Sequence, residues 1–552
     1  MPDRKGKEII NLQKGEIMKQ TMQEFKEFIQ QKRWTVLITM LAVLMCYGKH
    51  AFTTNVDIDT EELILGATSN MQGWLHIGRF GGYYTKALTG GMWHNPYFNG
   101  VLFLTLFSLG MVLLMFLFWR MNRDFPVMIF GLFYATTSIW CFVIYFSMLQ
   151  VELAIGILCA IIALHILYGI MTEKREKGTG KLPLILKVIA SVALLVWAFG
   201  CYQAILVFYL VAGVGMYVAY YRNQMEQGNA KLGTNLLQIV FLLAHFVVGY
   251  GIYSFIANKF FSGSSYLTSQ IAWGQRPILD VIRTILAVIK STYLNDILKF
   301  RYLLFPVFVL ILVDLVLVWT RKFAISSKIV YMLLEAAFVW TPFALTVYMG
   351  GDMPYRTKFA LALYIAIAVM YLFWSIRRSI RAYEPSVWRD RIQTGVQAVL
   401  VVAVAIWLMQ QLSVNLRLWY TDDVCNEQNR IVAENIYDHI SALGLGEEPE
   451  AQVVILGRKQ VRLNRACVSP EIEMFGASNF RWDYMLPTGC TNRSLMYLHA
   501  YTGVDYRYPD AENIAYAIEA GETMPIYPAD GYVQYDAEHN LILVKLSDYT
   551  EE

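Results

Sequence analysis

Long apolar runs recur along most of the chain and are separated by short polar connections. A bilayer core about 30 Å thick requires about 20 apolar residues in a spanning helix. Eleven runs come close to this length, and each predicts a membrane-spanning helix. We expect the spans at residues 34–52, 101–119, 125–146, 151–171, 182–199, 204–221, 234–256, 302–320, 329–348, 359–376 and 394–412.

Lysine and arginine gather on alternate connections between these spans. Residues 1–33 carry eight of them, and five further connections, among them residues 172–181, carry sixteen. The short connections on the other side carry two, Arg356 and Lys358. Because basic residues near span ends stay in the cytoplasm, we expect a cytoplasmic N-terminus. With an odd number of spans, the C-terminal segment is then extracytoplasmic.

Three long polar pieces fall on the expected outer side. They are the loops 53–100 and 257–301 and the segment 413–552. We therefore divide the chain into a cytoplasmic segment (1–33), a membrane domain (34–412) and a C-terminal domain (413–552).

The C-terminal domain differs in character from the spans, because its charge rises and turn residues appear. Apolar residues at helical spacing predict a helix over 423–443. A buried strand is predicted over 451–457, and two strands within 527–546 flank a polar turn. These elements predict a small α/β domain of about 130 residues.

The composition agrees with this layout. Of 552 residues, 56% are hydrophobic and 16% are charged, whereas soluble domains carry about 25% charged residues. The aromatic content of 14% suits a protein with two membrane interfaces. A net charge of +3 is too small to indicate nucleic-acid binding. The composition indicates a polytopic α-helical protein of the plasma membrane, with the lipid bilayer as its surroundings.

Of the seven cysteines, four lie in or beside spans, where a small apolar thiol is usual. Cys425, Cys467 and Cys490 fall in the C-terminal domain. An oxidising exterior permits a disulfide there, and we expect Cys467 and Cys490 to pair.

The first outer loop holds the candidate chemistry. Asp57, Asp59, Glu61 and Glu62 lie within six residues directly after a span. Carboxylates at this spacing can converge on a hydroxyl as a general base. They can also hold a divalent metal, Mg²⁺ or Mn²⁺, with Asp57 and Asp59 as its ligands. The alternative is a solvated acidic loop that caps a helix beginning near residue 60.

Trp74 and the triplet at residues 78–80 follow in the same loop. Glycines at 78, 81 and 82 would let the backbone approach a bulky ligand. Arg79 can pair with a phosphate or carboxylate group.

These residues resemble a known family. Asp57-x-Asp59, then Trp74 and Gly78-Arg79-Phe80, is similar to the pattern of the bacterial O-antigen-type glucosyltransferases, the type II Gtr family, which have the GT-C fold. The resemblance extends to the span layout, to GCYQA at 200–204 and to MPIYPADGYV at 524–533, and it covers nearly the whole chain.

The resemblance implies transfer of a sugar, expected to be glucose, from a polyprenyl phosphate to a cell-envelope glycan on the outer face. Asp57 or Asp59 would be the general base, with Asp57 slightly favoured because it is nearer the membrane. Positively charged side chains would stabilise the leaving lipid phosphate. The implied substrate-binding residues are Glu61, Trp74, Arg79, Tyr202, Gln203, Arg356 and Lys358. Arg356 has the alternative role of an interface anchor.

The second outer loop predicts an amphipathic helix within 276–294, with Ile278, Ile282, Ile285 and Ile289 on one face. It would lie in the membrane interface and either shape a groove for the isoprenoid chain or serve a structural role.

Two acidic residues, Asp314 and Glu335, fall inside expected spans, near their cytoplasmic ends. Ionisable residues within spans are often functional, and a transporter or flippase of a lipid-linked glycan would use them. If catalysis is outside, we expect them to face each other or nearby basic side chains. A third interpretation is a non-enzymatic scaffold whose C-terminal domain binds polysaccharide.

Overall fold

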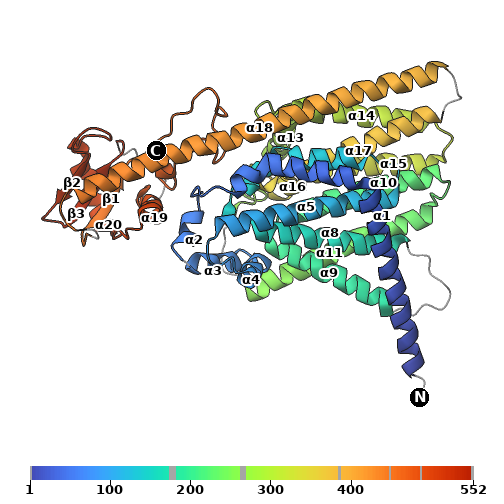
Figure 1. The fold of residues 1–552 in the computed structure, drawn as a ribbon, viewed down its shortest axis with the longest axis horizontal. Helices are drawn as coiled ribbons and strands as arrows, with labels where there is room; N and C mark the ends of the chain where they lie inside the picture. Colours follow the sequence, from blue (N-terminus) through green and yellow to red (C-terminus); the bar gives the residue numbers. More distant parts are fainter. Residues whose placement is uncertain are drawn as a thin grey trace.

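The computed structural model describes residues 3–66, 68–172, 182–261, 269–382, 387–446, 449–484 and 488–548. Long helices lie side by side in one bundle, and one of them leaves the bundle toward a small sheet (Figure 1). The N-terminal half contains α1 (Asp3–Ala51), α2 (Thr60–Ile64), α3 (Thr68–His76), α4 (Phe80–Thr89), α5 (Pro96–Met121), α6 (Val127–Thr136), α7 (Ile139–Ile144), η1 (Ser147–Leu149), α8 (Gln150–Thr172), α9 (Leu182–Cys201), α10 (Ile205–Glu226) and α11 (Leu232–Phe260).

The second half completes the bundle and adds the sheet. Its helices and strands are α13 (Ile278–Leu294), α14 (Arg301–Thr320), α15 (Ile325–Trp340), η2 (Thr341–Phe343), α16 (Ala344–Met349), η3 (Tyr355–Thr357), α17 (Ala360–Arg381), α18 (Val387–Ser441), β1 (Gln452–Leu456), η4 (Asn479–Arg481), α19 (Thr491–Thr502), α20 (Ala511–Ala520), η5 (Gly521–Thr523), β2 (Val533–Asp536) and β3 (Leu541–Lys545).

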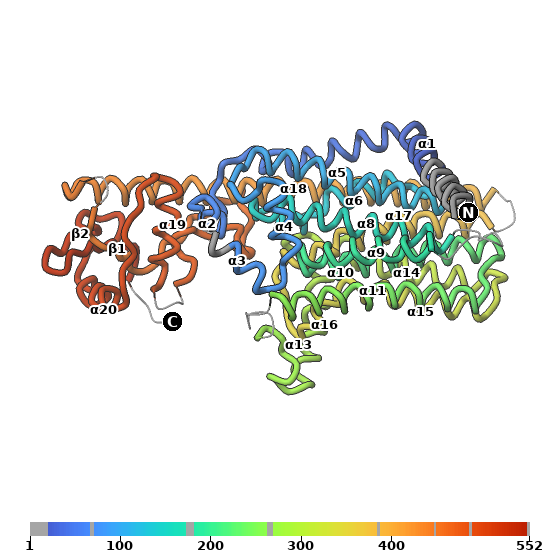
Figure 2. Tube along the Cα trace, turned by 90° about the horizontal axis from the view of Figure 1, so that it is seen from below, coloured from blue at the N-terminus to red at the C-terminus, as the bar shows by residue number. Residues whose placement is uncertain are grey.

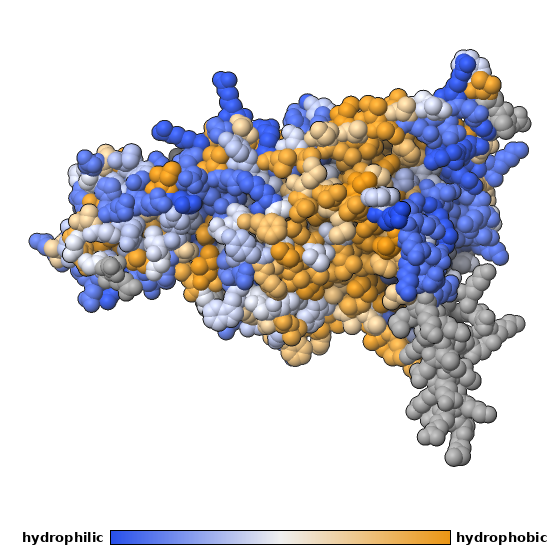
Figure 3. Space-filling model, viewed as in Figure 1, coloured by the Kyte–Doolittle hydropathy of each residue, from blue (hydrophilic) through white to orange (hydrophobic). Residues whose placement is uncertain are grey.

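Among the described residues, ten helices are long and apolar enough to cross a membrane. Figure 3 shows apolar side chains gathered over the long helices, with hydrophilic side chains toward both ends of the molecule. This belt is what a lipid-facing bundle requires, and the chain is a multi-pass membrane protein. Most of the expected connection at 172–181 lies outside the described residues.

The expected continuous span over 125–146 is wrong, because the structure divides it into α6 and α7, and η1 follows directly after it. The helix breaks at Thr137, whose backbone is extended (φ −64°, ψ 120°). Two side chains of α18 satisfy the freed backbone groups: Gln411 Oε1 accepts from the Ser138 N–H at 2.9 Å, and Asn415 Nδ2 donates to the Thr136 carbonyl at 2.7 Å. Irregular backbone inside a membrane bundle is stable when it is buried and satisfied in this way.

Helix α18 runs without a break across residues 412 and 413, where we expected the membrane domain to end. Its 55 residues correspond to about 80 Å at 1.5 Å per residue, far more than a bilayer core. The helix therefore crosses the bundle and continues as one wall of the C-terminal region (Figure 1).

The C-terminal sheet has the order β1-β3-β2, with β1 parallel and β2 antiparallel to β3. All three strands lie where the sequence predicts them. Alternate residues of β1 face opposite sides: Val453 and Ile455 pack with residues of α18 and α19, whereas Val454 and Leu456 pack with Ala517 of α20. The sheet is thus covered by helices on both faces.

The two acidic residues within the spans meet, as one of our interpretations expected. The Tyr331 hydroxyl lies 2.5 Å from Asp314 Oδ2 and 2.9 Å from Glu335 Oε1. Asp314 also accepts from the Ser375 hydroxyl at 2.6 Å, and Ser375 accepts from the Arg222 Nε at 3.3 Å. These residues lie at the end of the bundle away from the sheet.

Helix α13 forms in the second outer loop and projects from the side of the bundle (Figure 2). Val281, Ile285 and Val288 are buried, whereas Ile278 and Ile282 are exposed. The apolar residues therefore divide between a strip that packs on the protein and a strip that is free to meet lipid.

The expected Cys467–Cys490 disulfide is absent, because every cysteine is a free thiol in this structure. Cys467 lies near Cys425 on α18, and its carbonyl accepts a hydrogen bond from Arg417 at 2.7 Å. Cys490 instead precedes α19 and lines a small pocket beside β1. The two thiols belong to different packing environments.

We expect Cys467 and Cys490 to react with an alkylating reagent in denaturant without prior reduction, because neither has a bonded partner. Peptide mapping by mass spectrometry checks this. A map in which these two positions become alkylated only after reduction would contradict the structure.

Candidate functional site

The first outer loop lies between the bundle and the C-terminal sheet, as Figures 1 and 2 both show for α2, α3 and α4. Asp57 is the most enclosed acid of this loop, with no exposed surface. Its Oδ2 accepts from the Ser147 backbone N–H at 3.4 Å, and its Oδ1 has no hydrogen-bond partner. An unpartnered, buried carboxylate oxygen is available to a ligand that reaches it.

The surroundings of Asp57 favour its neutral form. Burial raises the pKa of the Asp57 carboxyl group well above its ordinary value, and the neighbouring Asp422 carboxylate raises it further. Hydrogen bonds from Ser147 act in the opposite direction. Asp422, on α18, is itself held by Asn55, whose Nδ2 donates to Oδ2 at 3.0 Å.

Asp59 and Glu61 converge on one cation from the C-terminal region. Arg493 Nη1 donates to Asp59 Oδ1 at 3.1 Å and to Glu61 Oε1 at 2.8 Å. Glu61 is 2% exposed, and its Oε2 has no hydrogen-bond partner. Burial raises the pKa of Glu61 to about 7, although the Arg493 guanidinium lowers it.

Three consecutive residues just after α7 meet two candidate side chains and Lys86. The Arg356 guanidinium lies 5.3 Å from the Phe146 ring centroid, and the Ser147 N–H bonds to Asp57. The Met148 carbonyl accepts from Lys86 Nζ at 2.7 Å. The break in the third span therefore brings Arg356 and Asp57 to adjacent residues of one segment.

Arg79, Tyr202 and Gln203 form a second group. Arg79 Nε donates to Gln203 Oε1 at 3.2 Å, and its guanidinium lies 4.8 Å from the Tyr202 ring centroid. The Tyr202 ring in turn stacks at 6.2 Å on Phe359, which follows Lys358. The sequence named all three as candidate substrate-binding residues, and the structure shows that they are in contact. Its interpretation of the glycines differs from the structure: a Cβ on Gly81 would meet α9 backbone atoms at 2.6–2.8 Å, so this glycine permits close helix packing.

Arg356 and Lys358 lie on the connection that contains η3. Lys358 Nζ donates to Asp352 Oδ1 at 2.6 Å. Glu473 approaches from the C-terminal region, accepts from the Tyr355 N–H and lies near Arg356. Burial raises the pKa of Glu473, whereas these donors and cations lower it.

Trp74 lies beside a buried ion pair, formed by Lys86 and Glu152, that the sequence did not reveal. Lys86 Nζ lies 3.1 Å from Glu152 Oε1, with both side chains at most 2% exposed, and 5.5 Å from the Trp74 ring centroid. Trp74 therefore packs against a paired cation and is 8% exposed.

The segment 466–484 covers this end of the bundle. Phe475 is fully buried, with its ring 5.2 Å from that of Tyr145 and 5.6 Å from that of Trp419. Asn479 Nδ2 donates to the Val56 carbonyl at 3.1 Å, next to Asp57. The carboxylates thus lie beneath a cover made by the C-terminal region.

Comparison with known proteins gives the family. A family model described as glucosyl transferase GtrII matches residues 28–373, more than half of the chain. The chain belongs to the GtrII glucosyltransferase family. A search of curated proteins finds no match. The resemblance seen in the sequence is therefore confirmed at the level of the family.

The family match covers some of the site residues of this GtrII chain and leaves others outside it. It spans Asp57, Arg79, Tyr202 and Arg356, whereas Arg493 lies beyond it. The sequence missed Arg493 and Glu473 because they are single charged residues in a polar region, with no motif around them. Lys86 and Glu152 carried a weak signal, since Glu152 lies at the start of an expected span, where a buried acid calls for a partner.

The predicted residues do not form one continuous cluster. Asp57, Asp59 and Glu61 lie together, and Arg79, Tyr202 and Gln203 form a second group. Of the remaining residues, Arg356 contacts Phe146, Trp74 lies beside Lys86, and Lys358 binds Asp352. Among the described residues, no group of three or more His, Cys, Asp or Glu side chains is arranged to hold a metal ion.

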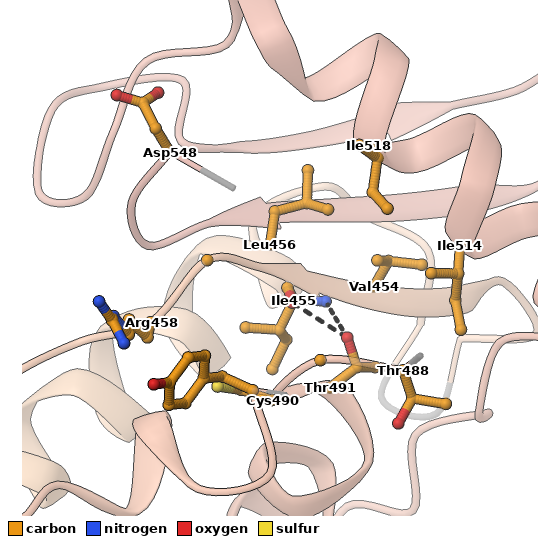
Figure 4. Close-up of a pocket in the computed structure, with 13 residues that line it drawn as sticks. Val454, Ile455, Leu456, Arg458, Thr488, Cys490, Thr491, Ile514, Ile518 and Asp548 are labelled. Carbon is orange, nitrogen blue, oxygen red and sulfur yellow. Dashed lines mark hydrogen bonds between the residues drawn. The ribbon is translucent and has the colours of Figure 1, made fainter. Parts of the chain in front are cut away.

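A small pocket lies in the C-terminal region of this GtrII chain, away from the acidic loop. It has a volume of about 20 Å³ and lies beside β1, with Arg458, Cys490 and Thr491 among its lining residues (Figure 4). Thr491 hydrogen-bonds to the Ile455 backbone at 3.0 Å. A cavity of this size holds about one water molecule, so it does not hold a sugar.

Proposed function

We propose that the chain transfers glucose from a polyprenyl phosphate to a hydroxyl group of a cell-envelope glycan, with Asp57 as the general base. Membership of the GtrII family supports glucosyl transfer. The observation that carries the choice of base is the free Oδ1 oxygen of Asp57, buried beneath the C-terminal cover.

The reaction requires one proton transfer and one displacement. Asp57 Oδ1 takes the proton of the acceptor hydroxyl while the acceptor oxygen attacks the anomeric carbon of the donor. The bond between that carbon and the phosphate oxygen breaks, and its electron pair leaves with the lipid phosphate. Asp59 is less suited to be the base, because Arg493 already occupies its carboxylate.

The leaving phosphate carries negative charge that positively charged side chains can stabilise. Arg356 is suited to this role because Phe146 places it one residue from the Ser147–Asp57 contact. Arg79 is held by Tyr202 and Gln203, which leaves part of its planar donor group free for a phosphate. Lys358 and Trp74 would complete the contacts to the donor, as the sequence predicts.

We place this site on the extracytoplasmic side, with the N-terminus in the cytoplasm. The support is the distribution of basic residues, which gather on the connections at the end of the bundle away from the sheet. The GT-C architecture is part of the same proposal.

We expect Asp57→Asn to lower kcat about 10²- to 10⁴-fold, because the amide cannot accept the proton. The measurement is transfer of labelled glucose from polyprenyl-phosphate glucose in detergent or proteoliposomes. Asp314→Asn is the matched control, because it changes a buried acid at the opposite end of the bundle. If Asp57→Asn stays active while Asp314→Asn is inactive, the proposed base is wrong and a transporter is favoured.

We expect the transfer rate to rise with pH. The base acts only when ionised, and burial raises the pKa of Asp57, so activity is low at acidic pH and increases as the carboxyl loses its proton. Initial rates between about pH 5 and about pH 9 check this. The residual activity of Asp57→Asn should lack this rise; an unchanged profile in that variant would contradict the assignment.

We expect Arg356→Ala and Arg79→Ala to raise the apparent KM for the lipid-linked donor, about tenfold for the loss of one charged contact of about 1.4 kcal/mol. A donor titration at saturating acceptor measures this. Arg283→Ala on exposed α13 is the control, since its nearest acid is Asp280. A change in acceptor KM alone would assign the arginines to the other substrate.

A further inference from the structure

Arg493 lies within 4 Å of four acidic side chains, three of which belong to the first outer loop. It lies in the first turn of α19, far beyond the family match at 28–373. Its Nη1 contacts Asp59 and Glu61, and Glu62 Oε1 lies 3.7 Å away. Its Nε donates to Asp483 Oδ2 at 3.1 Å, and the side chain is 13% exposed. One cation from the C-terminal region therefore holds the acidic loop.

The contacts of the loop lead directly to the proposed base. Asp59 and Glu61 flank Thr60, so Arg493 fixes the backbone on both sides of that residue. The Thr60 N–H donates to the Asp57 carbonyl at 3.0 Å. The Thr60 hydroxyl lies 3.2 Å from the Ser147 hydroxyl, and Ser147 is the residue that bonds to Asp57.

Asp59 also adopts a backbone conformation that needs support. Its φ of 69° lies in the left-handed region, which is unfavourable for a residue with a side chain. Its side chain makes no capping hydrogen bond to α2 and bonds to Arg493 instead. The ion pair therefore holds this turn from outside the loop.

We propose that Arg493 is a positioning residue for glucosyl transfer: it acts through Asp59 and Glu61 and holds the loop so that Asp57 faces the reacting hydroxyl. This inference rests on the proposed function. It implies that the C-terminal region, outside the family match, completes the active site, because the loop that bears the base is held from that region.

The test compares Arg493→Met with Arg493→Lys and Arg481→Met in the full-length protein. Arg481 is the matched control, because it forms an ion pair with Glu471 at 2.6 Å in the same region without touching the acidic loop. We expect Arg493→Met to lower kcat about 100-fold, the scale of a small displacement of a catalytic group. The donor KM should stay unchanged, Arg493→Lys should recover part of the loss, and Arg481→Met should match the wild type.

A double variant keeps the test valid if Arg493→Met folds poorly. Glu61→Gln with Arg493→Met removes the buried carboxylate that would otherwise lack a partner. Because both residues act through one contact, the double variant should be no worse than the poorer single variant. Multiplied losses, a lysine variant no better than methionine, or an equal loss in Arg481→Met would each overturn the inference.

The results for the Arg493 variants test the positioning role separately from the proposal that Asp57 is the general base. If Asp57→Asn is inactive while Arg493→Met keeps the wild-type kcat, the base stands and the positioning role fails. If Asp57→Asn is active, the base fails, and a non-additive loss in the Arg493 and Glu61 variants would then still show that the two residues act through one contact.

Discussion

Inside a bilayer, a helix can be interrupted only where other groups satisfy the backbone that the interruption exposes, because an unsatisfied peptide group there costs several kcal/mol. The break at Thr137 meets this requirement through Gln411 and Asn415 of α18, and through the Tyr47 hydroxyl, which donates to the Ala135 carbonyl at 2.7 Å. Without these side chains the segment would favour a straight helix. In the structure, residues 146–148 follow the broken helix and contact Arg356, Asp57 and Lys86.

The second constraint is the balance of buried charge around the loop. Asp57, Glu61 and Asp422 are each at most 3% exposed, and burial of an ionised carboxylate is costly unless it is paired. The chain solves this differently at each position: Asn55 donates to Asp422, Arg493 pairs with Glu61, and Asp57 keeps one oxygen free. Glu61 also keeps one oxygen without a partner, but Arg493 binds its other oxygen, whereas Asp57 is bound through the Ser147 N–H and pairs with no cation.

The sequence predicted the elements that depend on local pattern. Apolar runs located ten long helices. A short apolar run located β1, and a polar turn between two strand patterns located β2 and β3. The family resemblance named Arg79, Tyr202 and Gln203 as candidate residues, and only the structure shows that they are in contact. The sequence failed where the outcome depends on distant partners. The break at Thr137 depends on α18, about 270 residues later, and nothing within residues 125–146 reveals it.

The same limit explains the errors in the C-terminal region. We expected Cys467 and Cys490 to pair because both lie in the C-terminal domain. In the structure, Cys467 lies beside α18, whereas Cys490 directly precedes α19. Arg493 was missed because its partners, Asp59 and Glu61, lie more than 430 residues earlier. A lone arginine has no periodicity to detect, so only the fold can show what it pairs with. Since α18 is continuous from the bundle to the sheet, that pairing is set by the rigid helix that carries the C-terminal region to the loop.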